Sequence, residues 1–226
     1  IYPDREGFRR LASQGNLIPV YKEIIADTDT PVSALHKLSS GRYAFLLESV
    51  EGGERLGRYS FVGASAAAIF RSWGKQVEIL RPDGSRESFT ADDPLAALES
   101  LLTAHQTVPV PGLPRFFGGA VGYLGYDVVR HWEPLGPPPA DDLGLPETTF
   151  IITDSLLVFD HVSRKIQVVV SAPVQGDADA AYDRAVAEIE RILSRLRSPH
   201  APLTPLDQAL NGAAAGQIAY TSNVTP

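Results

Sequence analysis

The chain has 226 residues, of which 44% are hydrophobic and 21% are charged, and its formal net charge is −7. This length allows one large domain or two ordinary ones with a sizeable core. The acidic balance argues against a nucleic-acid partner, which requires a basic surface. The absence of cysteine excludes disulfides and thiolate chemistry and fits a cytoplasmic protein. No apolar run has the length of a membrane span, so we expect no membrane partner.

Capping signals and a hydrophobic run predict the first elements. Asp4 can cap a short helix that buries Phe8 and Leu11. Residues 16–25 are predicted to be extended, with Pro19 at an edge or a bulge. Thr30 followed by proline is typical of a helix start and predicts a helix over PVSALHKL.

A series of short strands is predicted next. The runs 43–50 and 58–65 form two strands joined by a turn that contains two glycines. Further strands are predicted in AAIFRSW, KQVEILRP and SRESFT, with a hairpin turn at Asp83-Gly84. Asp93 and the proline after it open a helix over PLAALESLLTAH.

The second half of the chain begins with a glycine-spaced aromatic stretch over 118–132, interpreted as close backbone packing, and an exposed loop over 134–146. Two long strands are expected over 148–162 and 165–174. Asp177 then opens the most regular amphipathic helix of the chain. Strands in meander order with helices between them predict an α+β fold with largely antiparallel sheets.

Catalytic and metal-binding patterns do not stand out. There is no phosphate-binding loop of the G-x-x-x-x-G-K-[ST] type and no H-x-x-x-H pair. His161, in VFDHV, is interpreted as a structural hydrogen-bonding residue. The acidic pairs Asp92-Asp93 and Asp141-Asp142 are interpreted as caps or loop acids. We therefore assign no catalytic residue, no metal ligand and no cofactor to this chain.

One cluster could bind an amino acid. Such a ligand needs an acceptor for its ammonium, donors for its carboxylate and an apolar wall. In LLESVEGGERLGRYSF, Glu48 can supply the acceptor, Ser49 and Arg58 the donors, and Leu47 part of a wall, together with Leu46, Tyr59 and Phe61. The same residues also fit a solvated hairpin with surface ion pairs, and the residues alone leave both interpretations open. Arg55 receives no role.

Four blocks of sequence resemble the amino-terminal half of anthranilate synthase component I, in the order that the family has them. They are NLIPVYKEIIADTDTPVSALHKL, YAFLLESVEGGERLGRYSFVG, FFGGAVGYLGYDVVR and VFDHVSRKI. The most specific feature is LLES followed by GER-x-GRYSF. The closing YTSNVTP resembles the S-N-[VM]-T that introduces the carboxy-terminal, chorismate-binding half of the family. Since there is also no methionine at position 1, we expect a partial product.

The resemblance implies a domain division, a fold and an activity. Residues 1–197 would form the effector-binding and scaffold domain, 198–217 a Pro/Ala/Gly-rich linker and 218–226 the start of the chorismate-binding domain. The fold would be half of an αββα body with two packed sheets. The family makes anthranilate and pyruvate from chorismate and ammonia or glutamine in tryptophan biosynthesis. It uses Mg²⁺ held by the carboxy-terminal half, so this chain alone is expected to be inactive.

The resemblance also implies partners and an effector. A glutamine amidotransferase subunit, component II, would deliver ammonia, and the chain's own carboxy-terminal domain would complete the enzyme. L-tryptophan would act as feedback inhibitor. Part of its site would be formed by Leu47, Glu48, Ser49 and Arg58. Loop lengths vary in the family, so the match at Arg58 rests on the alignment of the strands.

Two alternatives remain at this point. One is the equivalent half of aminodeoxychorismate synthase component I, which tends to carry a different residue pair after the leucines and to lack GRYSF. The other is a stand-alone amino-acid-binding or interaction domain without a catalytic half.

Overall fold

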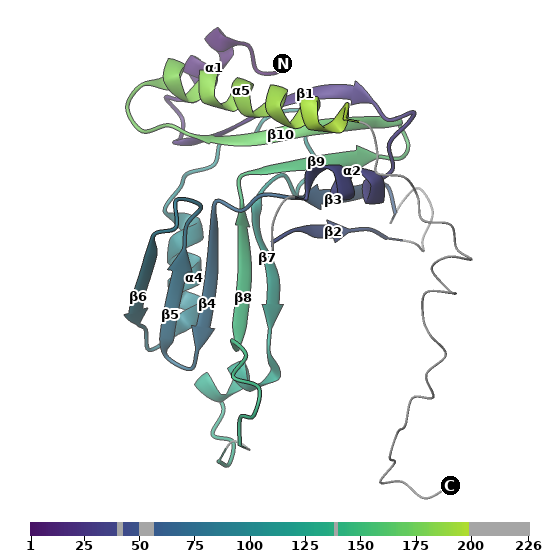
Figure 1. Ribbon diagram of the computed structural model, residues 1–226. Helices are drawn as coiled ribbons and strands as arrows, with labels where there is room; N and C mark the ends of the chain where they lie inside the picture. Colours follow the sequence, from purple (N-terminus) through teal and green to yellow (C-terminus); the bar gives the residue numbers. More distant parts are fainter. Residues whose placement is uncertain (40–42, 50–56, 138–139, 199–226) are drawn as a thin grey trace, which may run out of the picture.

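The computed structural model describes residues 1–39, 43–49, 57–137 and 140–198. Two five-stranded antiparallel sheets form the framework, here named sheet A and sheet B (Figure 1). Sheet A has the order β1 (Leu17–Ile25), β10 (Lys165–Pro173), β9 (Ser155–Asp160), β3 (Tyr59–Gly63) and β2 (Phe45–Leu47). Sheet B has the order β6 (Arg86–Thr90), β5 (Gln76–Leu80), β4 (Ala68–Trp73), β8 (Thr148–Thr153) and β7 (Gly119–Leu124). The predicted α+β fold with largely antiparallel sheets is confirmed.

Helices cover one face of sheet A. They are α1 (Arg5–Leu11), α2 (Pro31–Leu38) and α5 (Ala178–Leu196), and their apolar sides share one buried cluster with the sheet. Phe8 and Ile189 are fully buried in this cluster, as the helical spacing predicts. The predicted caps are confirmed, because Asp4, Thr30 and Asp177 each accept backbone N–H groups at a helix start. β1 is an edge strand, which explains how it accommodates Pro19.

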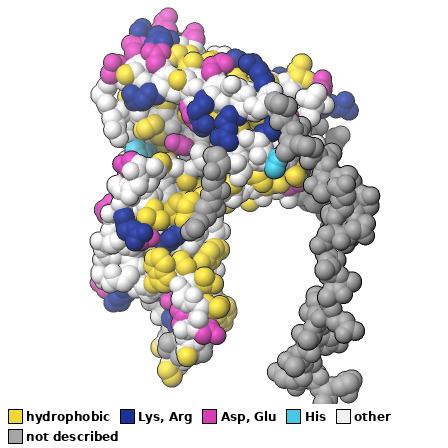
Figure 2. Space-filling view, viewed as in Figure 1, with side chains coloured by type: hydrophobic (Ala, Val, Ile, Leu, Met, Phe, Trp, Pro, Cys, Tyr) yellow, Lys and Arg dark blue, Asp and Glu magenta, His cyan; other side chains and the backbone are white. Residues whose placement is uncertain are grey.

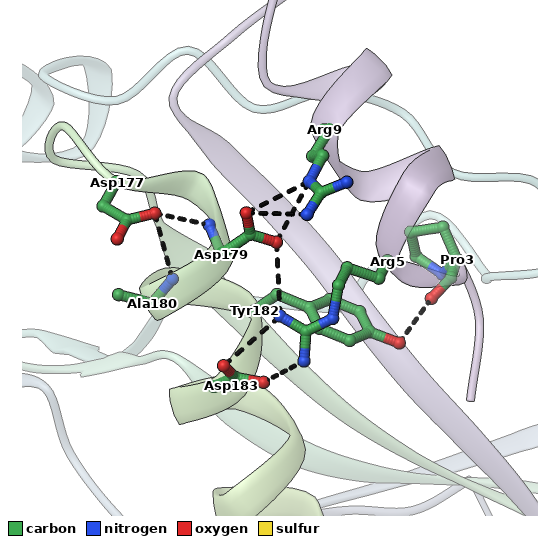
Figure 3. A network of polar contacts seen from close by, with 8 residues as sticks. All are labelled: Pro3, Arg5, Arg9, Asp177, Asp179, Ala180, Tyr182 and Asp183. Atoms are coloured by element: carbon green, nitrogen blue, oxygen red, sulfur yellow. Dashed lines mark hydrogen bonds and ion pairs between the residues drawn. The ribbon is translucent and has the colours of Figure 1, made fainter.

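Ion pairs fasten α1 to α5 (Figure 3). Arg5 lies between Asp179 and Asp183, and its guanidinium also lies over the ring of Tyr182, 5.0 Å from the centroid. Arg9 donates three hydrogen bonds to Asp179, of 3.0, 3.1 and 2.9 Å. These groups are largely exposed, so each pair is screened by solvent and adds little by itself. Their effect is to fix how α1 packs on α5.

Sheet B has its own apolar cluster. Helix α4 (Pro94–Thr103) packs on one face, where Leu98 meets Phe70, Val77 and Ile79. The helix starts at Asp93, whose carboxylate accepts the backbone N–H groups of residues 95 and 96, as predicted. The buried clusters of the described residues therefore assign α4 to sheet B and the other α-helices to sheet A.

The prediction of one long strand over 148–162 is wrong, because the structure divides this segment into two strands at Asp154. β8 pairs with β4 and β7 in sheet B, whereas β9 pairs with β10 and β3 in sheet A. Three consecutive polar residues, Thr153 to Ser155, occupy the change of sheet. The backbone N–H of Ser171 donates to the carbonyl of Asp154 over 2.6 Å, outside the regular ladder. The chain thus turns from one sheet into the other at Asp154. The strand predicted over 43–50 is also shorter in the structure, where β2 spans Phe45–Leu47.

The glycine-spaced stretch has the predicted close packing in β7. A Cβ atom on Gly122 would lie 1.9 Å from the carbonyl oxygen of Thr149 on the paired strand β8. The stretch ends in the 3₁₀ helix η1 (Tyr126–His131). The remaining predicted strands and the Asp83-Gly84 turn are confirmed, with Gly84 at a φ of +83°.

Exposed apolar side chains gather near the end of β7 and in the segments that follow it. Tyr126 is 86% exposed, and further large apolar groups there are Tyr123, Leu124, Trp132, Leu135, Leu143 and Leu145. Figure 2 shows hydrophobic surface over this lower part of the molecule. In the described part of the chain no helix combines the length and the apolar character needed to cross a membrane.

Candidate functional site

The candidate site lies where β2 ends, at the edge of sheet A. β2 pairs with β3 so that Leu47 faces Phe61, and Glu48 and Ser49 follow directly. Leu47 is 41% exposed, although it sits in a strand. The register therefore presents a carboxylate and a hydroxyl at the end of an apolar strand, as the sequence predicts.

Glu48 belongs to a polar chain with Ser60 and His161. The hydroxyl of Ser60 donates to the Glu48 carboxylate over 3.4 Å, and it lies 2.7 Å from Nε2 of His161. Ser60 is only 1% exposed. A hydroxyl that donates its one proton to Glu48 accepts from His161, so this arrangement calls for a proton on Nε2. The interpretation of His161 as a hydrogen-bonding residue agrees with this geometry.

The side chain of Arg58 is held in place by Asp160 and Tyr59. Its guanidinium donates to both carboxylate oxygens of Asp160, over 3.1 and 2.8 Å, and lies 4.9 Å from the ring centroid of Tyr59. Asp160 also accepts the backbone N–H of Val162 at 3.0 Å. The hydrogen bond from Arg58 is the main cause that lowers the pKa of Asp160 to about 2, and the pKa of Arg58 is raised in turn.

The two faces of sheet A divide the predicted site. Side chains alternate along a strand, so Tyr59 and Phe61 share one face and Ser60 lies on the other. Leu47 is the cross-strand partner of Phe61 and lies on that first face, where the Phe61 ring meets Phe116 edge-on at 5.2 Å. Glu48 contacts Ser60 on the helix-covered side. Of the predicted wall, Leu47, Tyr59 and Phe61 therefore lie on the face opposite to Glu48, whereas Leu46 packs against the helix-side cluster on the same side as Glu48.

Sequence reasoning did not assign Ser60 or Asp160 to this site. Both owe their position to the pairing of β3 with β9, in which Tyr59 faces Asp160 and Ser60 faces Phe159. The strands are about a hundred residues apart in sequence, so no local pattern predicts the contact. Arg55 lies outside the described residues. Within those residues no group of three His, Asp or Glu side chains is placed to hold a metal ion.

Comparison with known proteins gives the relatives of this chain. The family model described as chorismate binding enzyme matches residues 42–224. Anthranilate synthase component 1 of Pseudomonas aeruginosa is 41% identical over 225 residues, which cover 98% of this chain and 45% of that protein. The protein of the same name from Acetivibrio thermocellus is 35% identical over 224 residues, or 99% of this chain and 45% of that protein.

Among solved structures, the chain is similar to that of anthranilate synthase component I from Streptococcus pneumoniae. It has a TM-score of 0.49 and 26% sequence identity, over 78% of this chain and 37% of that one. The chain spans less than half the length of these relatives. Since the family model matches most of its residues, the chain belongs to the family of chorismate binding enzymes, and it is similar to anthranilate synthase component I over nearly its whole length.

Proposed function

We propose that this chain is the amino-terminal half of an anthranilate synthase component I, a lyase that makes anthranilate and pyruvate from chorismate and ammonia. The observation that carries this proposal is the 41% identity to such a protein over 98% of the chain. The match to 45% of that protein's length supports a role as one part of a longer enzyme. The division into residues 1–197, a linker over 198–217 and a further domain from 218 onward belongs to the same proposal.

The proposed half has partners that complete the enzyme. The exposed apolar groups around Tyr126 and Trp132 support contact with a further domain, because a large exposed apolar patch marks an interaction surface. A glutamine amidotransferase would supply the ammonia. Mg²⁺ would be held by the carboxy-terminal half, so this chain alone would be inactive. The described residues contain no group of three His, Asp or Glu side chains placed to hold a metal ion.

The proposed role of this half is feedback regulation by L-tryptophan at the end of β2. Glu48 would accept the ammonium group, with its carboxylate oriented by Ser60. Ser49 would bind the ligand next to it. Arg58, fixed by Asp160 and 46% exposed, would act as a positioned cation for the carboxylate. Leu47 would supply apolar contact from the opposite face of β2, so the ligand would bind around the strand end instead of on one face.

Regulation follows if tryptophan binds one arrangement of the full enzyme more tightly than another. A ligand shifts such an equilibrium only by its differential affinity for the two states. A strand end at the sheet edge is suited to this, because a neighbouring domain can contact the same groups in one arrangement and release them in another.

Ser49→Phe tests the effector site in the full-length enzyme. The larger side chain would fill the space beside Glu48, so we expect the tryptophan concentration for half-inhibition to rise at least about tenfold, equivalent to about 1.4 kcal/mol of lost binding. Anthranilate fluorescence measures the rate, and inhibition is expressed relative to each variant's own uninhibited rate.

Ser194→Phe is the matched control, because Ser194 is exposed on α5, away from β2. It should leave inhibition as in the parent. If the Ser49→Phe enzyme and the parent have the same tryptophan concentration for half-inhibition, Ser49 is not part of the effector site. Formation of an aminodeoxychorismate product instead of anthranilate would contradict the proposed activity itself.

A further inference from the structure

The two sheets meet at the end of β9 opposite to the candidate site. A cavity of about 450 Å³ lies there. Its volume falls in the lower half of the range for small-molecule sites, about 300 to 1,000 Å³, which suits a single-ring molecule better than a nucleotide. Both sheets, α4 and the segment before β7 contribute to its lining, which includes Leu101, Leu102, Arg115, Phe117 and Asp154.

Backbone hydrogen bonds fix the walls of this cavity. The Ser171 N–H donates to the Asp154 carbonyl at 2.6 Å, and the Ala67 N–H donates to the Ile152 carbonyl at 2.8 Å. The Val108 N–H donates to the Leu17 carbonyl at 3.0 Å. These bonds join the residue at the change of sheet to β10, the residue before β4 to β8, and the segment after α4 to β1. The cavity is therefore a preformed part of the fold, as ligand sites usually are.

The charges around the cavity favour a cation at one end. Asp154 lines it, and within the described residues it forms no ion pair with lysine or arginine. The last turn of α4 also lines it through Leu101 and Leu102, and that turn carries no basic residue. A helix C-terminus has negative partial charge, so two separate features attract a positive group here.

Arg115 supplies the opposite charge. It lines the same cavity, and in the described part of the chain its guanidinium has neither a hydrogen bond nor an ion pair. Leu101, Leu102 and Phe117 provide apolar wall between the charged groups. A carboxylate, a free guanidinium and an apolar wall together are the groups that recognise a zwitterion with an apolar side chain.

We propose that this cavity binds a small apolar amino acid, with Asp154 holding its ammonium group and Arg115 its carboxylate. This site is separate from the proposed tryptophan site, since Asp154 precedes the first residue of β9 and Asp160 ends that strand. Six residues of extended strand span about 20 Å. One bound molecule of this size therefore does not occupy both sites.

Nuclear magnetic resonance titration of the full chain tests the proposal with three compounds that share a phenyl ring and differ in their charged groups. L-phenylalanine has both charges, 3-phenylpropanoate lacks the ammonium and 2-phenylethylamine lacks the carboxylate. We expect L-phenylalanine to bind saturably. Loss of the ammonium should weaken binding about tenfold or more, and loss of the carboxylate less, because Arg115 is exposed.

Substitutions assign each charge. Asp154→Asn should remove the preference for L-phenylalanine over 3-phenylpropanoate, and Arg115→Gln should remove the preference over 2-phenylethylamine. Asp142→Asn and Arg184→Gln, both at exposed positions outside the cavity lining, should change neither preference. The Ser49→Phe chain should bind L-phenylalanine in this cavity as the parent does, which separates this site from the tryptophan site.

The Asp154→Asn chain is expected to fold at least as stably as the parent at pH 7. Burial raises the pKa of Asp154, which means that the folded state disfavours its ionised form. Leu102→Trp, at the exposed end of α4, is a second variant that narrows the cavity and should also weaken binding. The proposal is overturned if L-phenylalanine shows no saturable binding up to about 10 mM. It is equally overturned if the Asp154→Asn chain folds and keeps the preference for the ammonium.

Discussion

Asp160 is the residue of the candidate site whose charge the fold stabilises most strongly. It accepts two hydrogen bonds from Arg58 and backbone N–H groups from Val162 and Ser163. Its side chain is 11% exposed, whereas that of Arg58 is 46% exposed. Solvent therefore screens the cation more than the carboxylate, and the ion pair stabilises the fold by less than the pKa shift alone would suggest.

Asp160→Asn should destabilise the chain by about 1–2 kcal/mol at pH 7. The pKa of Asp160 is lowered from 3.8 to about 2 in the folded state, so its contribution is present above pH 3.8 and is lost as the pH falls toward 2. Urea denaturation of the variant and the parent measures the free energy of unfolding, at pH 7 for the size of the contribution and at acid pH for its loss. Equal stability of variant and parent at pH 7, with Asp142→Asn as the neutral control, would show that the pair contributes nothing.

Ser60 and His161 show where residue-level prediction stops. The sequence placed Glu48 and Ser49 at a strand end, because an apolar run followed by polar residues and glycines is a local signal. It could not show that Ser60 lies between Glu48 and His161, since that contact needs the register of β3 on both β2 and β9. His161 could be interpreted as a hydrogen-bonding residue, but its partner could not be named.

At the scale of elements, β7 shows how a glycine sets the distance between two strands. Gly122 faces Phe150 in the β7–β8 ladder, and the carbonyl of Thr149 occupies the space that a side chain would need. The glycine spacing in the sequence predicted close packing there, although it did not identify which glycine was required.

Gly122→Ala should destabilise sheet B by about 1–3 kcal/mol, because its Cβ atom forces β7 away from β8. Thermal unfolding followed by circular dichroism measures the loss. Gly136→Ala is the matched control: no atom lies within 4 Å of the Cβ position at Gly136, so its stability should stay within about 0.5 kcal/mol of the parent. If the two variants have the same stability, the close approach of the strands is not a constraint.

At the scale of the whole molecule, each sheet has its own apolar cluster. The cluster of sheet A includes α1, α2 and α5, and the cluster of sheet B includes α4. The junction between the sheets is polar around Asp154 and contains the cavity. Separate cores joined by a polar junction favour local opening of one part before the other.

Leu98→Ala should therefore weaken sheet B more than sheet A. Removing a buried leucine side chain costs about 2–5 kcal/mol, and here the loss falls in the smaller cluster. Native-state hydrogen exchange should show faster exchange in β4 and β5 while β9 and β10 keep their protection. Ile189→Ala in α5 is the matched variant for sheet A, and it should speed hydrogen exchange in β9 and β10 more than in β4 and β5. Equal loss of protection in both sheets after either substitution would mean that the chain unfolds as one unit.

The sequence by itself determined the elements that depend on neighbouring residues. Caps at Asp4, Thr30, Asp93 and Asp177, the amphipathic period of α5 and the turn at Gly84 are local, and all were predicted. The antiparallel α+β class followed from the order of those elements, and the strand end at Glu48 followed from its own residues.

Only the tertiary structure decided which strands share a sheet and what the sites contain. The division of β8 from β9 at Asp154 depends on partners such as β10 and β3, which a run of hydrophobic residues does not specify. For the same reason the pairing of Arg58 with Asp160 and the joint placement of Asp154 and Arg115 could not be predicted. These contacts join residues far apart in sequence, and their geometry is fixed by backbone pairing and burial instead of by local preference.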